Sequence, residues 1–161
     1  MSDTTTAPAA ADAATQAALE RLNTVIDRLI APDGCPWDST QTPESLTEYV
    51  IEECHELVDA IRSGKTADMV EELGDVAFLI LMIGKLMARA GGPSLADALE
   101  VEAAKMVRRH PHVFSDTTYE NQSEQLKDWD RIKREEKAAA DAEGPKGTYD
   151  SLPRGLPPLT K

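Results

Sequence analysis

The chain has 161 residues, of which 41% are apolar and only 4% aromatic, a composition that suits one helical domain with a hydrophobic core. Its formal net charge of -12 repels the phosphate backbone of nucleic acids, so we expect no nucleic-acid partner. Two cysteines, Cys35 and Cys54, are too few for a disulfide scaffold, and the N-terminus has no apolar signal-peptide core, which favours a cytoplasmic protein.

Apolar residues recur at spacings of three and four through most of the chain, a pattern typical of amphipathic helices. Five helices are predicted, over residues 14–31, 43–62, 66–90, 95–109 and 124–140. They form one domain over residues 14–143, with a disordered tail over 1–13 before it and an irregular tail over 144–161 after it. No segment has the pattern of a strand, so the predicted fold class is all-α, a bundle of about five helices.

Capping and turn residues set the predicted helix ends. Thr42 is expected to cap the second helix, and Gly64 to end it. Ser94 is expected to cap the fourth helix and Ser123 the fifth, with a loop over residues 110–122 between these two helices.

The third predicted helix contains the most apolar run of the chain, residues 76–88. This run is too short to span a bilayer and includes Lys85, so we expect no membrane contact. It is apolar on almost every side, and this apolar surface is larger than the other helices of one five-helix monomer can cover. We therefore expect this helix to pack against a second subunit, intertwined in a homodimer or a dimer of dimers.

Two acidic pairs interrupt the apolar segments of the second and third predicted helices. Residues three apart share a helix face, so Glu53 and Glu56 project together, as do Glu72 and Asp75. The short connection between the helices predicts antiparallel packing, which brings the four carboxylates to one place. A single pair of this kind is usually a solvated face, but two pairs on adjacent helices favour a functional site.

Four carboxylates at one place need compensation, since two like charges about 4 Å apart repel by about 4 kcal/mol at an effective dielectric of about 20. Either some carboxylates are protonated, with raised pKa values, or a cation lies among them. Oxygen-only ligands suit Mg²⁺ or Mn²⁺, and protein-bound Mg²⁺ usually completes its shell with waters and substrate phosphates. The spacing therefore predicts a metal site for a phosphorylated substrate. A di-iron site built on Glu52 and His55 is the weaker alternative, because the second cluster has no histidine.

The segments "EECHE" and "EELGD" resemble the E-E-x-x-E and E-x-x-D motifs of the MazG-type nucleoside triphosphate pyrophosphohydrolases. Further segments resemble MazG proteins in the same order: "GCPWDSTQTPESL", "KMVRRHPHVF", "WDRIKREEK" and "YDSLPRGLPPL". The resemblance covers residues 18–160. It implies an all-α, oligomeric, Mg²⁺-dependent enzyme that hydrolyses nucleoside triphosphates to the monophosphate and pyrophosphate. MazG proteins commonly carry two tandem domains, so this chain, with one motif set, is expected to be a natural single-domain form or a truncated one.

The resemblance also assigns the acidic residues. It implies that Glu53, Glu56, Glu72 and Asp75 bind Mg²⁺, with Mn²⁺ as a substitute. It implies a catalytic role for Glu52 or Glu53 in orienting the attacking water.

The resemblance implies that cationic and aromatic residues bind the substrate. These are Lys105, Arg108, Arg109, Trp129, Lys133 and Trp37. The alternative for the three cations near residue 109 is that they complement a helix C-terminus, and the alternative for the two tryptophans is a place in the core. Trp129 and Lys133 are expected to reach the nucleotide from the second subunit, with the indole stacked on the base.

A non-catalytic module that binds metal-nucleotide, or acts as a scaffold, is the alternative function. The same carboxylates would bind the ligand without turnover, and the acidic surface would serve protein partners.

Overall fold

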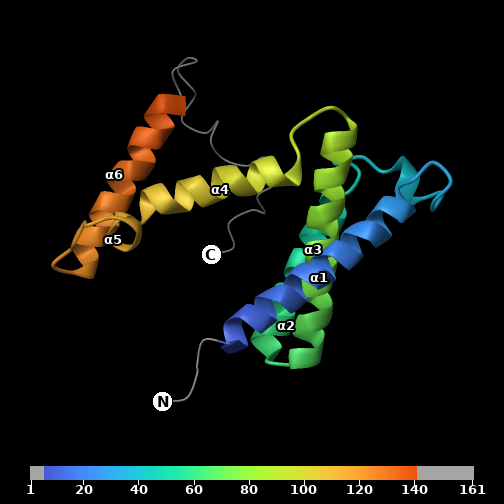
Figure 1. Cartoon of the computed structure of the whole chain (residues 1–161), viewed down its shortest axis with the longest axis horizontal. Helices are drawn as coiled ribbons and strands as arrows, with labels where there is room; N and C mark the ends of the chain where they lie inside the picture. Colours follow the sequence, from blue (N-terminus) through green and yellow to red (C-terminus); the bar gives the residue numbers. More distant parts are fainter. Residues whose placement is uncertain (1–5, 141–161) are drawn as a thin grey trace, which may run out of the picture. The chain divides into compact units, whose positions relative to one another are not determined.

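The computed structural model describes residues 6–140, and this part of the chain is helical with no strand, which confirms the predicted all-α class. The elements are α1 (Thr6–Leu29), the short 3₁₀-helix η1 (Asp38–Thr40), α2 (Thr47–Ser63), α3 (Thr66–Arg89), α4 (Leu95–Arg109), α5 (Pro111–Phe114) and α6 (Gln122–Ala140) (Figure 1). The chain divides into two compact units between Leu99 and Glu100, within α4. The irregular tail predicted over residues 144–161 lies outside the described residues.

The first unit is organised around α3. Its core is formed by Ile26 of α1, by Ile30 directly after this helix, by Leu46, and by four residues of α3, Leu79, Leu81, Met82 and Leu86. α2 and α3 lie side by side as a helical hairpin, and α1 packs on α3 (Figure 1). Lys85 Nζ donates to Asp27 Oδ1 at 2.6 Å and adds a polar link between α3 and α1. No helix in the described part of the chain is long and apolar enough to cross a bilayer.

The first helix begins at Thr6, and not at residue 14 as predicted. Residues 6–13, expected to be disordered, are helical. The segment is rich in alanine, the residue with the highest helix propensity, and its one proline lies in the first turn, where proline is tolerated. The apolar spacing used for the prediction starts only after this segment and therefore missed it.

The second helix begins at Thr47, later than the predicted residue 43. The backbone N–H of Ser45 donates to Thr42 Oγ1 at 3.2 Å, and the N–H of Thr42 donates to Ser45 Oγ at 3.0 Å. Thr42 therefore closes a separate turn, and its predicted role as the cap of α2 is wrong. The predicted end is confirmed, because Gly64 has φ +71° and its N–H donates to the carbonyl of Ala60 at 3.2 Å.

The remaining caps are partly as predicted. The N–H of Ser94 donates to Asp97 Oδ2 at 2.7 Å and the N–H of Asp97 donates to Ser94 Oγ at 3.3 Å, which confirms Ser94 as the cap of α4. The predicted loop over residues 110–122 contains α5, which Pro111 opens. The cap of α6 is Asn121, whose Oδ1 accepts the N–H of Glu124 at 3.0 Å, so the prediction of Ser123 is wrong.

Candidate metal and nucleotide site

The α2–α3 hairpin brings carboxylates of both acidic pairs together. Glu53 and Glu56 from α2 and Glu72 from α3 each offer one carboxylate oxygen, and these three oxygens lie within 4.8 Å of one another. Glu53 and Glu72 are half-buried, whereas Glu56 is exposed. The antiparallel hairpin predicted from the short connection thus places an oxygen cluster at its surface, which we call the carboxylate cluster.

Asp75, the fourth predicted ligand, is not a member of this cluster. Its charge nevertheless acts there, because it raises the pKa of both Glu53 and Glu72. Residues three apart on a helix are displaced by about 4.5 Å along the helix axis, so the two members of a pair need not be equally near the facing helix.

Partial burial, and after it electrostatic repulsion, raises the pKa of two carboxyl groups of the cluster. Partial burial raises the pKa of Glu53, and the charges of Asp75, Glu56 and Glu52 raise it further. Partial burial likewise raises the pKa of Glu72, followed by the charges of Glu56 and Glu53. Among the described residues, no lysine or arginine forms an ion pair with a member of the cluster. Three uncompensated carboxylates with converging oxygens fit a hard divalent cation such as Mg²⁺.

The acids beside the cluster have simpler roles. Asp59 pairs with Arg62, with 3.7 Å between Oδ1 and Nη1, on the exposed side of α2. Glu52 is exposed and contributes to the cluster only through its charge. His55 is exposed and does not belong to the cluster, so the described residues contain no support for the di-iron alternative.

Thermal unfolding at different pH values tests this repulsion. Because the pKa values of Glu53 and Glu72 are raised in the folded state, these groups contribute stability below their ordinary pKa of 4.5 and lose it as the pH rises through the folded value. We therefore expect the midpoint temperature of unfolding of the metal-free protein to decrease as the pH rises from about 5 to about 7. Mg²⁺ should raise this temperature at the higher pH.

A matched pair of variants separates this effect from the overall charge of the protein. Glu72→Gln should flatten the pH dependence and weaken the response to Mg²⁺, whereas Asp59→Asn, with the same loss of charge on the exposed side of α2, should retain both. An unfolding temperature that does not change when Mg²⁺ is added to the unaltered protein would contradict a cation site.

The predicted cations lie in the second unit, where Lys105, Arg108 and Arg109 of α4 each have an acidic partner. Arg109 Nε and Nη2 donate to Glu136 Oε2 at 2.9 and 2.8 Å, and Arg108 Nε donates to Glu136 Oε1 at 3.2 Å. Lys105 pairs with Glu102 one turn earlier on α4. Glu136 was not among the predicted site residues, although its spacing of three from Lys133 and seven from Trp129 places all three on one face of α6.

The two tryptophans differ in their surroundings. Trp129 is half-buried in the second unit, with Lys133 Nζ 4.1 Å from its ring centroid and Arg109 Cζ 6.0 Å from it. Trp37 lies in the first unit, is 48% exposed, and contacts Tyr49 edge-on with 5.7 Å between the ring centroids. The alternative of a core position is therefore wrong for Trp37. The carboxylate cluster and Trp37 belong to the first unit, and the other predicted substrate residues belong to the second.

Comparisons with known proteins identify the family that this chain resembles. The MazG nucleotide pyrophosphohydrolase domain matches residues 41–114. A protein of Escherichia coli (strain K12) named nucleoside triphosphate pyrophosphohydrolase is 38% identical over 144 residues, which cover 89% of this chain and 54% of that protein. The chain belongs to the MazG family. The matched MazG segment contains the carboxylate cluster, Asp75 and the three cations of α4.

Two proteins of Thermotoga maritima extend the comparison. One, named nucleoside triphosphate pyrophosphohydrolase/pyrophosphatase MazG, is 39% identical over 118 residues, which cover 73% of this chain and 45% of that protein. The crystal structure of a MazG-related protein matches with a TM-score of 0.61 at 29% identity, covering 71% of this chain and 98% of that one. The chain spans about half the length of the two curated relatives.

Proposed function

We propose that this MazG-family protein hydrolyses nucleoside triphosphates to the nucleoside monophosphate and pyrophosphate. The observation that carries the proposal is the carboxylate cluster, in which three oxygens from two helices converge within 4.8 Å. The relatives named nucleoside triphosphate pyrophosphohydrolase support the same substrate class. We further propose that residues 14–143 act as the functional domain. Because both cysteines of the protein are free, we also propose that it is cytoplasmic.

In this proposal Glu53, Glu56 and Glu72 hold Mg²⁺, with Asp75 as a fourth ligand and Mn²⁺ as a substitute. When bound, the cation would supply positive charge beside the carboxylates and the phosphates and would make a nearby water molecule a stronger acid. Glu52 or Glu53 orients that water and accepts its proton. The water oxygen bonds to the α-phosphorus while the bond from this phosphorus to the bridging oxygen breaks, and pyrophosphate leaves.

The residues of the second unit have binding roles in this scheme. Lys105 and Arg109 neutralise the charge that develops on the departing pyrophosphate, and Arg108 assists them. Trp129 of a second copy offers the face of its indole to the base, beside Lys133 of that copy, and Trp37 borders the nucleotide. Stacking depends little on the identity of the base, so we expect turnover of several nucleotides.

The products formed from a panel of ribo- and deoxyribonucleoside triphosphates with Mg²⁺ test the proposal. We expect pyrophosphate and the monophosphate in equal amounts. Orthophosphate as the first product would contradict it. Nucleotide binding without any product after long incubation with Mg²⁺ or Mn²⁺ would support the non-catalytic module.

We also propose that the α2–α3 hairpin pairs with a second copy, in a homodimer or a dimer of dimers. Along α3, Val70, Leu73 and Ile80 are 67%, 60% and 49% exposed, and their spacing places them on one face. Ile51 and Val58 of α2 are 52% and 40% exposed. Apolar side chains in this number along one hairpin are typical of a surface that another protein covers.

Sedimentation at micromolar concentration tests the assembly. We expect a dimer or tetramer for the unaltered protein and for Val113→Glu, which introduces a charge at an equally exposed valine of α5. Leu73→Glu should dissociate the assembly, because the carboxylate would be buried without a partner. A monomer in the unaltered protein, or the same mass for both variants, would contradict this proposal.

A further inference from the structure

Glu136 joins two consecutive arginines through separate oxygens of one carboxylate. Oε2 accepts both hydrogen bonds from Arg109, at 2.8 and 2.9 Å, and Oε1 lies 3.1 Å from Arg108 Nη2. The side chains of Arg109 and Glu136 are only 18% and 23% exposed, whereas that of Arg108 is 56% exposed. The less exposed of the two arginines is therefore the one that donates two hydrogen bonds to Glu136.

The same face of α6 carries Trp129, Lys133 and Glu136, at spacings of four and three. Arg109 lies 6.0 Å from the centroid of the Trp129 ring, and Lys133 Nζ lies 4.1 Å from it. Glu136 thus fixes a guanidinium from α4 beside an aromatic ring that projects from its own helix. Among the described residues, Arg109 Nη1 makes no hydrogen bond, so its two N–H groups are left for a further acceptor.

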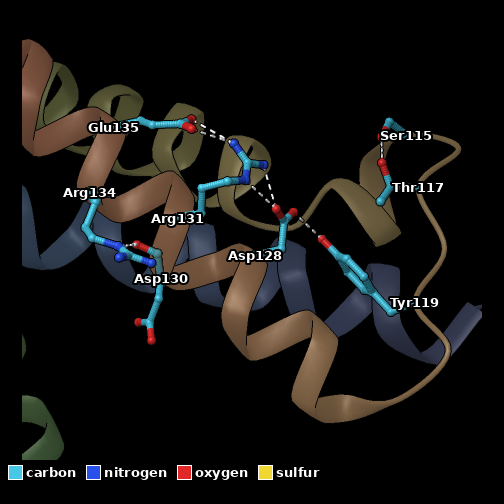
Figure 2. A network of polar contacts seen from close by, with 8 residues as sticks. All are labelled: Ser115, Thr117, Tyr119, Asp128, Asp130, Arg131, Arg134 and Glu135. Atoms are coloured by element: carbon cyan, nitrogen blue, oxygen red, sulfur yellow. Dashed lines mark hydrogen bonds and ion pairs between the residues drawn. The ribbon is translucent and has the colours of Figure 1, made fainter.

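A neighbouring face of α6 has a separate polar network (Figure 2). Asp128 Oδ2 accepts the hydroxyl of Tyr119 at 2.7 Å, and Asp128 Oδ1 accepts Arg131 Nε at 2.8 Å. Arg131 Nη1 also donates to both oxygens of Glu135 at 2.8 Å. This network connects the chain before α6 to the helix. Glu135 and Glu136 are adjacent in sequence, yet they hold different arginines.

We propose that Glu136 is a positioning residue for nucleotide binding, which holds Arg109 beside Trp129 with the Nη1 donors directed to the phosphates. This inference rests on the proposed function. The hydrogen bonds from Arg109 and then Arg108 lower the pKa of Glu136, so the carboxylate is ionised at neutral pH. Two charge-assisted bonds to one oxygen fix the guanidinium more firmly than a single bond does.

Positioning and simple charge predict opposite effects when Glu136 is replaced by glutamine. Because the carboxylate is negative, its removal would strengthen binding of an anionic triphosphate if charge alone mattered. Glutamine has one acceptor oxygen, and its amide N–H groups face the donors of the arginines. It can hold one arginine at most, so positioning predicts weaker binding.

Steady-state kinetics of Glu136→Gln, Glu136→Asp and Glu135→Gln, with a nucleoside triphosphate that the unaltered protein hydrolyses, test the proposal. For Glu136→Gln we expect KM to rise and kcat/KM to fall about tenfold or more, the size of effect expected from loss of one charge-assisted contact. Glu136→Asp retains the charge on a shorter side chain, so its KM should lie between those of the unaltered protein and Glu136→Gln. Glu135→Gln, with the same charge change one residue earlier, should keep the KM of the unaltered protein.

Several outcomes would overturn the proposal. An unchanged or lower KM in Glu136→Gln would show that the carboxylate only repels the substrate, and equal losses in Glu136→Gln and Glu135→Gln would show a general loss of α6 packing. Failure of both Glu136 variants to fold, judged by circular dichroism, would make Glu136 a folding residue. If the unaltered protein hydrolyses no triphosphate, the proposed function fails. Equilibrium dialysis of Mg²⁺-ATP against the same variants then decides the role of Glu136 separately.

Discussion

Replacing Glu56 by glutamine is expected to lower the turnover of nucleoside triphosphates on the order of a thousandfold, the effect of losing a group that stabilises transition-state charge. Glu56 supplies one of the three oxygens that converge within 4.8 Å, so the amide would leave the cation with a neutral and weaker ligand. The fold should survive, because the substitution removes one of the charges that raise the pKa values of Glu53 and Glu72. The measurement is kcat with saturating Mg²⁺, together with the unfolding midpoint.

Asp59→Asn is the matched control for this substitution. Asp59 lies three residues further along α2, is exposed, and pairs with Arg62 at 3.7 Å. The control removes the same charge from the same helix and should retain activity within about twofold, since exposed ion pairs contribute little. Full activity in Glu56→Gln, or equal losses in both variants, would contradict a metal site at the carboxylate cluster.

Replacing Lys105 by methionine is expected to lower kcat/KM about a hundredfold, because the departing pyrophosphate would lose one neutralising cation. Lys105 is half-buried on α4 and pairs with Glu102 of the same helix. Such a pair within one helix adds little to stability, so the expected loss reflects the substrate and not the fold.

Lys65→Met gives the comparison for Lys105. Lys65, the residue directly before α3, also pairs with an acid three residues later, Asp68, with 3.5 Å between Nζ and Oδ2, and its side chain is 71% exposed. The proposed function gives it no contact with the nucleotide, so kcat/KM should stay near that of the unaltered protein. A similar loss in both variants would show that Lys105 acts through general charge alone.

The carboxylate cluster was predictable because its geometry is local. Glu53 and Glu56 share a face of one helix, and the short connection to α3 left antiparallel packing as the simplest arrangement. The C-terminal end of α2 and the start of α4 followed from Gly64 and Ser94, whose conformations or hydrogen bonds are determined by their immediate neighbours. Asp75 was the exception, because spacing along one helix does not fix the distance to the next.

The surroundings of the cations were not predictable in the same way. Arg109 and Glu136 are 27 residues apart, and no local pattern pairs them. Sequence spacing groups Lys105, Arg108 and Arg109 as a cationic cluster, but each has an acidic partner in the structure. The start of α1 was missed for a different reason, because alanine supplies helix propensity without the apolar periodicity on which the prediction depended.

The position of water attack tests the central claim most directly. Hydrolysis of a nucleoside triphosphate in ¹⁸O-labelled water, followed by mass spectrometry of both products, identifies the phosphorus that receives the solvent oxygen. If the carboxylate cluster promotes attack at the α-phosphorus, the label appears in the nucleoside monophosphate and the pyrophosphate is unlabelled. Label in pyrophosphate or in orthophosphate, with none in the monophosphate, would contradict the account.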